Sequence, residues 1–341
     1  MYMEKIKRYR GCLLAGAVGD ALGYQVEFDT LKRIIAEHGP RGVRVLCPII
    51  SDDTQMTLFT AEGMLAGLRH GMPMEAAVYQ SYLDWYRTQG GSAQGMFSGE
   101  SELLKLQRLH VRRAPGGTCL TALGSGNMGT MTRALNNSKG CGGVMRTAPC
   151  GLLKMMDAAD PEEAYALQGG AAAAITHSHP MGYVPAAMLA DMVHRIVQEE
   201  SDSLKEVVLS SLERIMRVFT REMDCAPQMM RAFRQLMLRA VELAEQDLPD
   251  TEAIAILGEG WVGDEALAIA VYCALKHVDS VEDCLSAAVT HKGDSDSTGA
   301  IAGNILGAWL GEDAIPAQWR TEVELADVIT GMADQLFAAA Q

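Results

Sequence analysis

The chain has 341 residues, of which 48% are hydrophobic and 21% are charged. That balance is typical of a globular protein and excludes an intrinsically disordered chain. The net charge of -14 at pH 7 repels phosphate backbones, so we do not expect binding to nucleic acid.

The eight cysteines contain no CxxC pair, which argues against a zinc ribbon or a thioredoxin-type redox centre. No apolar run approaches the ~18 residues of a membrane span, and we see no N-terminal signal sequence. We therefore expect a reduced, cytoplasmic, soluble monomer that does not bind a membrane.

Helical signals follow one another along the chain. Residues 11–23 are apolar with closely spaced small residues, which allow helices to approach tightly. The best candidate strand is Val43–Ile50 (VRVLCPII), although Pro48 weakens it. Apolar residues recur with helical spacing in five later segments, and an Ala-rich segment is typical of a buried helix; these are 204–219, 229–243, 265–275, 281–289, 322–337 and 171–175. We predict one all-α domain over residues 1–341, with helices around a common core.

Two acidic clusters each precede a predicted helix. Ser51 is a suitable N-cap, and Asp52 and Asp53 complement the dipole of the helix that follows. Asp294 and Asp296, in the sequence DSDS, have the DxD pattern of a hard-cation site before a helix of small and apolar residues. The glycine and glutamate that an EF-hand loop requires are missing. Each cluster alone has an ordinary explanation as a helix cap.

Considered together, the two clusters indicate a shared metal site. Four unpaired carboxylates that face one another repel strongly, and their burial costs several kcal/mol. Divalent cations relieve that repulsion, and all-oxygen ligands favour Mg²⁺ or Mn²⁺ over Zn²⁺. We therefore expect two ions about 3.5–4 Å apart. Asp20 is a candidate carboxylate behind this site, and Glu27 is within reach of a cation, although a lone Glu is usually a surface residue.

Residues 103–156 contain no Asp or Glu and are rich in glycine. The stretch carries eight basic residues: Lys105, Arg108, Arg112, Arg113, Arg133, Lys139, Arg146 and Lys154. Glycines allow backbone N–H groups to approach a ligand, and arginines add positive charge. The stretch is thus either a pocket for a phosphorylated small molecule or a solvated loop with a chance bias in charge.

Two further motifs are weaker. The GxGxxG pattern at 124–129 follows no convincing strand and lacks an acid about 20 residues later, so we reject a dinucleotide site. His177 and His179 form an HxH motif without a third soft ligand nearby, so we favour hydrogen bonding to a ligand over metal binding.

Several segments, in order, resemble the ADP-ribosylglycohydrolases, a family that includes dinitrogenase reductase-activating glycohydrolase and the eukaryotic ADP-ribosyl hydrolases. The resemblance covers about residues 8 to 311 and is carried by GCLLAGAVGDALGYQVEF, SDDTQMTLFTAEGML, SKGCGGVMRTAP, THSHPMGY and HKGDSDSTGAIAGNILGA. It implies a single-domain orthogonal multi-helix bundle of the ADP-ribosylglycohydrolase type, with two Mg²⁺ or Mn²⁺ ions.

The resemblance also implies roles for individual residues. The implied metal ligands are Ser51, Asp52, Asp53, Asp294, Asp296 and Ser297. Catalytic acid or base roles fall to Asp52, Asp53 or Glu27, and nothing in the sequence decides among them. The implied contacts to ADP-ribose are Gly116, Gly117, Ser138, Gly140, Cys141, Gly142, Gly143, Met145, Arg146 and His177, with Arg146 expected to help hold the pyrophosphate.

The activity implied by this resemblance is metal-dependent cleavage of the bond between ADP-ribose and a modified protein side chain, arginine being the expected linkage. The substrate partner is then the ADP-ribose moiety of an ADP-ribosylated protein. Two alternatives stay open: hydrolysis of O-linked or free ADP-ribose derivatives, and a catalytically silent protein that binds ADP-ribose. The intact acidic clusters favour an enzyme over the silent alternative.

Overall fold

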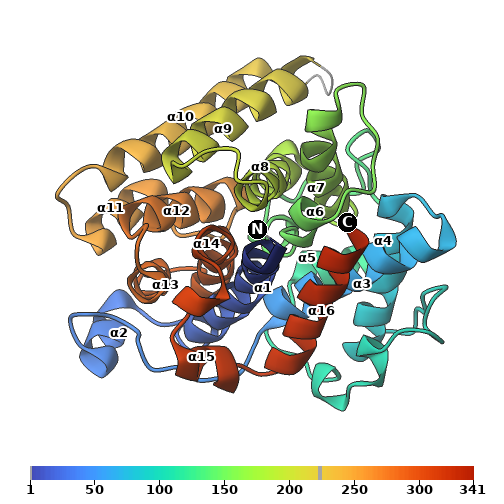
Figure 1. The fold of residues 1–341 in the computed structure, drawn as a ribbon, viewed down its shortest axis with the longest axis horizontal. Coiled ribbons are helices and arrows are strands. Elements are labelled where there is room, and N and C mark those ends of the chain that lie inside the picture. The colour runs from blue at the N-terminus through green and yellow to red at the C-terminus, as the bar shows by residue number, and fades with distance from the viewer. Residues whose placement is uncertain (1, 222–224) are drawn as a thin grey trace.

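The computed structural model describes residues 2–221 and 225–341, and those residues form α-helices and 3₁₀ turns without a β-strand (Figure 1). The helices are α1 (Tyr2–Tyr24), α2 (Leu31–His38), α3 (Asp52–His70), α4 (Met74–Thr88), α5 (Gly117–Gly124), α6 (Pro149–Leu152), α7 (Ala164–Ala174), α8 (Pro180–Val197), α9 (Leu204–Arg221), α10 (Pro227–Ala244), α11 (Asp250–Leu257), α12 (Gly263–Lys276), α13 (Val281–Val289), α14 (Ser295–Leu310), α15 (Ala317–Glu322) and α16 (Ala326–Ala339). The prediction of an all-α fold is confirmed.

Helices α1 and α14 form the centre of the fold and lie side by side (Figure 1). Glycines on both helices face the partner backbone. A Cβ atom on Gly19 would lie 2.0 Å from the Gly299 carbonyl oxygen, and one on Gly303 would lie 2.1 Å from the Ala15 carbonyl oxygen. Because real Cβ atoms do not approach backbone so closely, the glycines set the spacing of the pair. This spacing brings the last turn of α1 beside the first turn of α14, where a Cβ on Gly23 would meet Ser295.

We expect Gly303→Ala to lower the free energy of unfolding by about 1–3 kcal/mol, because the added methyl group forces the two helices apart. Gly331→Ala in α16 is the matched control, since a Cβ there meets nothing within 4 Å. Removing a helical glycine at that position is expected to stabilise the protein by about 0.5–1 kcal/mol. Urea unfolding of both variants measures the two values. Equal effects of the same sign would contradict the close packing of α1 and α14.

Four of the five helices predicted from apolar spacing, and the Ala-rich segment, are helical in the structure. Helices α9, α10, α12 and α13 cover four of the periodic segments, and α13 has the predicted bounds Val281–Val289. The Ala-rich segment belongs to α7, whose alanines 171–174 are buried. In these segments apolar residues recur with helical spacing because one face of each helix is buried in the core, so the spacing predicts the helix correctly.

The prediction of a helix through 322–337 is wrong at its N-terminal end. Helix α15 ends at Glu322, and α16 begins at Ala326. Leu325 between them has a left-handed backbone with φ of 62°. Glu324 turns away from the helix direction, because its backbone N–H donates to the Pro48 carbonyl oxygen and its carboxylate pairs with Arg113. Tertiary contacts therefore break a segment whose apolar spacing is continuous.

The prediction of a strand at Val43–Ile50 is also wrong. The segment is irregular and runs along the surface, with Val45 74% exposed and Ile49 43% exposed. Its hydrogen-bonding groups meet separate partners, as when the Val43 N–H donates to Thr290 Oγ1 at 3.0 Å. No neighbouring strand in the described residues completes a ladder, so β-branched residues alone do not make a strand here.

Side chains from almost every helix contribute to one continuous hydrophobic core. Helices α7 and α8 pack together, as do α3 and α4, on the sides of the central α1 and α14 pair (Figure 1). Within residues 2–221 and 225–341, no helix combines the length and apolar character that a membrane crossing requires. The core thus fixes the N-termini of α3 and α14, which carry the two acidic clusters.

Candidate active site

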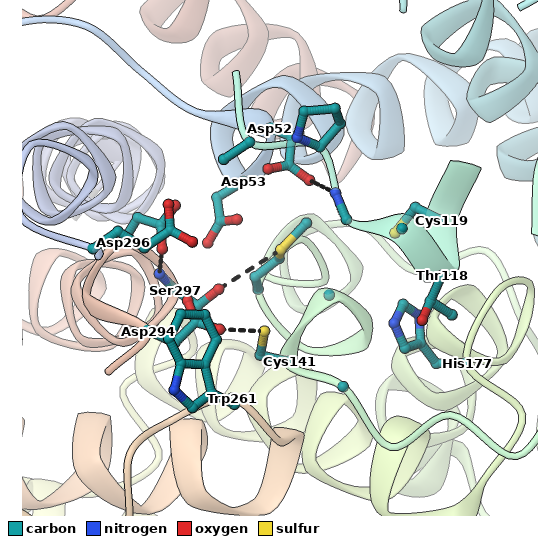
Figure 2. A pocket seen from close by; sticks show the side chains of 18 residues that line it. Asp52, Asp53, Thr118, Cys119, Cys141, His177, Trp261, Asp294, Asp296 and Ser297 are labelled. Carbon is teal, nitrogen blue, oxygen red and sulfur yellow. Dashed lines mark hydrogen bonds between the residues drawn. The ribbon is translucent and has the colours of Figure 1, made fainter. Parts of the chain in front are cut away.

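The first turns of α3 and α14 open into the same cavity, which has a volume of about 290 Å³. Asp52 and Asp53 enter it from α3, while Asp294 and Asp296 enter it from α14 and the residue before it (Figure 2). The two clusters are more than 240 positions apart in the sequence. The fold therefore brings the two clusters to one cavity, while the shared metal site stays a prediction.

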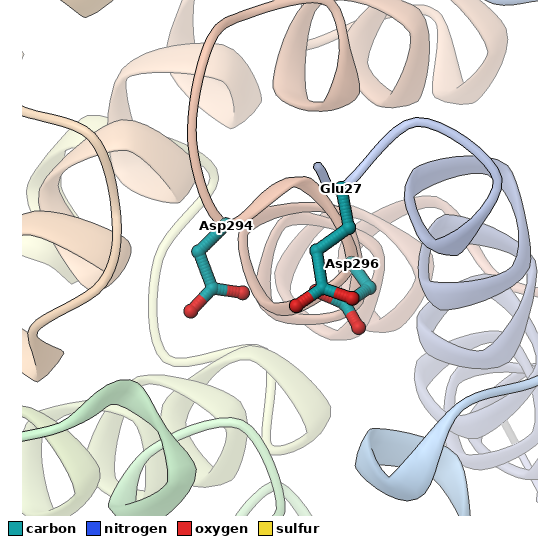
Figure 3. A group of neighbouring side chains, drawn as sticks. All are labelled: Glu27, Asp294 and Asp296. Atoms are coloured by element: carbon teal, nitrogen blue, oxygen red, sulfur yellow. The ribbon is translucent and has the colours of Figure 1, made fainter. Parts of the chain in front are cut away.

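A third carboxylate completes one side of the cluster. One carboxylate oxygen from each of Glu27, Asp294 and Asp296 lies within 4.8 Å of the other two (Figure 3). Glu27 follows the end of α1 and is buried, which separates it from the ordinary surface glutamate. Its side chain points towards the acids of α14, as Figure 3 shows. The arrangement gives a set of oxygen donors that fits a hard divalent cation.

Several of these carboxylates have defined partners, and two oxygens have none. Asp52 Oδ2 accepts a hydrogen bond of 3.1 Å from the Gly116 N–H, and Asp294 Oδ2 accepts one of 2.6 Å from the Cys141 thiol. Asp53 Oδ2 and Glu27 Oε2 are buried without a hydrogen-bond partner. Buried acceptors are normally satisfied, so these two oxygens indicate that a positively charged or donating group belongs in the cavity.

The acids perturb one another's protonation. Burial, followed by the charge of Asp296, raises the pKa of Glu27 to about 9. Burial raises the pKa of Asp53 and Asp294 well above the usual range, and the Asp296 charge adds to both shifts. The cluster therefore holds protons near neutral pH unless cations replace them. The side chains of these acids, with the Ser297 hydroxyl beside them, are oxygen donors that fit the hard ions expected from the sequence.

Asp20 on α1 lies behind the first cluster, as the sequence analysis expects. It is fully buried and accepts hydrogen bonds from the Ser51 N–H at 3.0 Å, from the Thr54 N–H at 3.1 Å and from the Thr54 hydroxyl. Burial, with the Asp296 charge, raises its pKa to about 7. Asp20 thereby holds the first turn of α3 against α1 and orients Asp52 and Asp53. Ser51 caps the same turn by accepting from the Asp53 N–H at 3.2 Å.

The opposite wall of the cavity is built from glycine-rich loops. Gly116 and Gly117 enter from the start of α5, and Gly140 and Gly142 enter from the loop before α6. The loop is tied to the segment before α12, because the Cys141 N–H donates to the Trp261 carbonyl oxygen at 3.2 Å. Glycine backbones leave room for N–H groups to reach a ligand. The wall suits an extended polar molecule rather than a compact apolar one.

The structure brings most of the residues proposed from the sequence into this cavity. Those that line it are Glu27, Asp52, Asp53, Gly116, Gly117, Gly140, Cys141, Gly142, Met145, His177, Asp294, Asp296 and Ser297. Four others do not line it: Ser51, Ser138, Gly143 and Arg146. Ser138 supports the glycine loop, since its hydroxyl lies 3.1 Å from Thr118 Oγ1. Gly143 is a packing residue, because a Cβ there would lie 2.2 Å from the Gly182 carbonyl oxygen.

The expectation that Arg146 contacts the pyrophosphate needs correction. Its side chain is fully buried behind Cys119 and Thr176, and no Lys or Arg among the described residues lines the cavity. The other cations of the basic stretch are distributed elsewhere; Arg113, for example, pairs with Glu324. A sequence stretch without acids therefore does not become a positively charged cavity wall here.

Five residues of the cavity wall were missed: Ala114, Pro115, Thr118, Cys119 and Trp261. Thr118 and Cys119 follow the glycine pair at the start of α5, and Trp261 precedes α12. Trp261 is 41% exposed, and its ring stacks on Phe28 with the centroids 6.2 Å apart. A lone exposed tryptophan in a loop has no sequence signal that distinguishes it from a surface residue.

Comparison with known proteins finds relatives that match nearly the whole chain. The family model described as ADP-ribosylglycohydrolase matches residues 1–341. The curated protein "ADP-ribosylhydrolase ARH3" from Danio rerio is 26% identical, covering 97% of this chain and 90% of the relative. "ADP-ribosyl-[dinitrogen reductase] glycohydrolase" from Rhodospirillum rubrum is 25% identical, and the match covers 93% of this chain and 90% of the relative.

Two more similarities extend the comparison. "ADP-ribosylarginine hydrolase Tri1" from Pseudomonas putida is 24% identical, covering 98% of this chain and 79% of the relative. The solved structure titled "ADP-ribosylglycohydrolase-related protein complex" has a TM-score of 0.65 at 24% identity and covers 99% of this chain and 100% of its own. That structural likeness supports the fold.

Proposed function

The chain belongs to the ADP-ribosylglycohydrolase family, and from this premise we propose that it hydrolyses the bond between ADP-ribose and a modified protein side chain, with arginine as the linked residue. The observation that carries this proposal is the meeting of two distant acidic clusters at one cavity whose other wall is glycine-rich. An acidic half suits a ribose and a reacting water, and a backbone-lined half suits an anionic diphosphate.

Two divalent cations, held by Asp52, Asp53, Asp294, Asp296 and the hydroxyls of Ser51 and Ser297, would supply positive charge and Lewis acidity at the ribose. The chain's own groups perform the remaining tasks. Asp52 is oriented by the Gly116 N–H, which couples the acidic half of the cavity to the glycine-rich half.

Acid or base catalysis falls to Asp52, Asp53 or Glu27. Asp53 Oδ2 and Glu27 Oε2 are free of hydrogen-bond partners, so each can hold a proton or a water molecule at the reacting carbon. Cleavage through a transition state of oxocarbenium character gains from a nearby carboxylate. We propose that these three groups share the catalytic and orienting roles.

Part of the cavity lining suits a cationic leaving group. Glu27, Asp294 and Trp261 line the cavity, and the Trp261 ring stacks on that of Phe28, which is 75% exposed. Aromatic faces beside carboxylates attract a planar cation such as a guanidinium. A serine-linked substrate offers no such charge. This contrast supports arginine as the linkage, in keeping with the name of the Pseudomonas putida relative, ADP-ribosylarginine hydrolase.

A release assay with matched peptides tests the proposal. We expect Mg²⁺ or Mn²⁺ to support release of ADP-ribose from an arginine-linked peptide at least about 10-fold faster than from a serine-linked peptide, a difference of ~1.4 kcal/mol in barrier. Chelation by EDTA is expected to abolish release. Faster release from the serine-linked peptide would replace the arginine assignment by the O-linked alternative.

Calorimetry with ADP-ribose separates an enzyme from a silent relative. Binding of ADP-ribose without release from either peptide would contradict the hydrolase and support a binding protein. Full activity in EDTA would contradict the metal site and, with it, the proposed role of both acidic clusters.

A further inference from the structure

Arg146 is a buried charge without an ordinary counter-ion. Its guanidinium is fully buried, lies 4.6 Å from the centre of the Tyr82 ring, and forms no ion pair with any described carboxylate. Nη1 donates to the sulfur atoms of Met56 and Cys119 at 3.2 and 3.3 Å, and Nε has no hydrogen-bond partner. Burying an unpaired charge costs several kcal/mol. Such a residue calls for a role beyond packing.

The guanidinium reaches the cavity wall through one hydroxyl group. Nη2 donates to Thr176 Oγ1 at 2.5 Å, and the same oxygen lies 2.8 Å from His177 Nδ1. Because a guanidinium can only donate, the Thr176 oxygen accepts from Arg146 and keeps its own proton to give. The Cys119 thiol is a second group within reach of that hydroxyl. When the proton goes to Nδ1, Nδ1 is an acceptor, and in a neutral imidazole the ring proton then resides on Nε2.

His177 is held neutral by the same surroundings. Burial, with the nearby charge of Arg146, lowers the pKa of His177 well below its usual range. The ring therefore has one donor and one acceptor near neutral pH, and the partner of Nδ1 decides which nitrogen donates.

The Nε2 edge of the ring faces the glycine-rich wall. A Cβ on Gly140 would lie 3.4 Å from Nε2, and one on Gly142 would lie 3.0 Å from Cε1. Both glycines and His177 line the cavity, and Figure 2 shows His177 beside Thr118 and Cys119, across the cavity from the acids. Among residues 2–221 and 225–341, none forms a hydrogen bond with Nε2. The glycines thus leave this N–H uncovered at the wall assigned to the diphosphate.

We propose that Arg146 is a positioning residue, which acts through Thr176 to fix His177 as the Nε2–H tautomer and so presents a hydrogen-bond donor to an anionic oxygen of the substrate. The identity of that anion as the diphosphate of ADP-ribose rests on the proposed function. The tautomer does not, because the groups that determine it belong to the ligand-free chain.

Nitrogen NMR of the ligand-free full chain tests the tautomer directly. We expect the ¹⁵N-labelled His177 ring, assigned by the loss of its signals in His177→Gln, to show the Nε2–H pattern. Thr176→Ser keeps the hydroxyl and should retain that pattern. Thr176→Val and Arg146→Met remove the relay at two different points and should each populate the Nδ1–H form. If Arg146→Met does not fold, the comparison of Thr176→Ser with Thr176→Val still shows whether the Thr176 hydroxyl sets the tautomer of His177. An Nδ1–H ring in the wild type would overturn the proposal.

Calorimetry with ADP-ribose tests whether the Nε2–H group of His177 binds an anionic oxygen of the ligand. Hydrogen bonds to charged groups correspond to about 10- to 100-fold in affinity, so we expect Thr176→Val to weaken the Kd by about 10-fold or more while Thr176→Ser stays close to wild type. Wild-type affinity in Thr176→Val, after its tautomer has changed, would overturn the role of His177 as an anion donor. A wild-type chain that binds no ADP-ribose would instead overturn the proposed function, whereas the NMR result would still decide the tautomer.

Discussion

Replacing Asp296 by asparagine is expected to abolish metal-dependent release of ADP-ribose and, at the same time, to raise the melting temperature of the metal-free protein. The loss of activity follows from removing a charged oxygen donor at the centre of the acidic cluster. Changes to residues that merely support metal ligands already cost about 10- to 100-fold, so we expect a loss of more than about 100-fold here.

The rise in stability has a separate cause. After burial itself, the Asp296 charge is the next contributor to the raised pKa of Asp20, Glu27, Asp53 and Asp294. Removing one negative charge relieves repulsion with all four groups, and the asparagine oxygen can still accept from the Ser297 N–H, as Asp296 Oδ1 does at 2.9 Å. We expect the melting temperature of the EDTA-treated protein to rise by about 2 °C or more.

Asp283→Asn is the matched control, since Asp283 lies in the first turn of α13 just as Asp296 lies in the first turn of α14. Asp283 pairs with Arg44 outside the cavity. We expect wild-type activity and no rise in melting temperature from this change. An Asp296→Asn protein that keeps its activity would contradict the metal site. One that loses both activity and stability would show that Asp296 is structural.

The sequence predicts this site better than it predicts the irregular segments, for a physical reason. Asp52 and Asp296 each stand at the start of a strong helix signal, and carboxylates placed there need a partner once the helix is buried. That need is local and can be inferred from residue types. The break at Val323–Leu325 depends instead on Arg113 and Pro48, which lie far away in the chain and leave no trace in the apolar spacing.

Arg146 illustrates the opposite failure. In the sequence it stands in a stretch of glycines and cations, which indicates a ligand-binding loop, and burial of a guanidinium cannot be inferred from such a pattern. The fold supplies Tyr82, Met56 and Thr176 around it from three different helices or loops. The location of the residue near the cavity is predictable, but its distance from the substrate and its indirect role come from packing.

The metal-free protein is expected to lose stability as the pH rises, and divalent cations are expected to restore it. Glu27 and Asp20 have folded-state pKa values raised to about 9 and about 7 from ordinary values of 4.5 and 3.8. A group with a raised pKa contributes stability that is fully present below its unfolded-state pKa and is lost as the pH rises through its folded-state pKa. The free energy of unfolding in EDTA should therefore fall between about pH 4 and pH 9.

Urea unfolding at intervals from pH 5 to pH 9, with and without Mn²⁺, measures this effect. Cations bind the ionised carboxylates of the folded state, so the stabilisation that they give should increase with pH. Glu27→Gln removes a group whose pKa is raised to about 9 and should make the decline less steep above pH 8, where Asp20 is already largely ionised. Two results would contradict this explanation: a free energy of unfolding in EDTA that does not depend on pH, or an equal gain in that free energy from Mn²⁺ at pH 5 and pH 9. Either would show that ionisation of the clustered acids does not destabilise the metal-free protein.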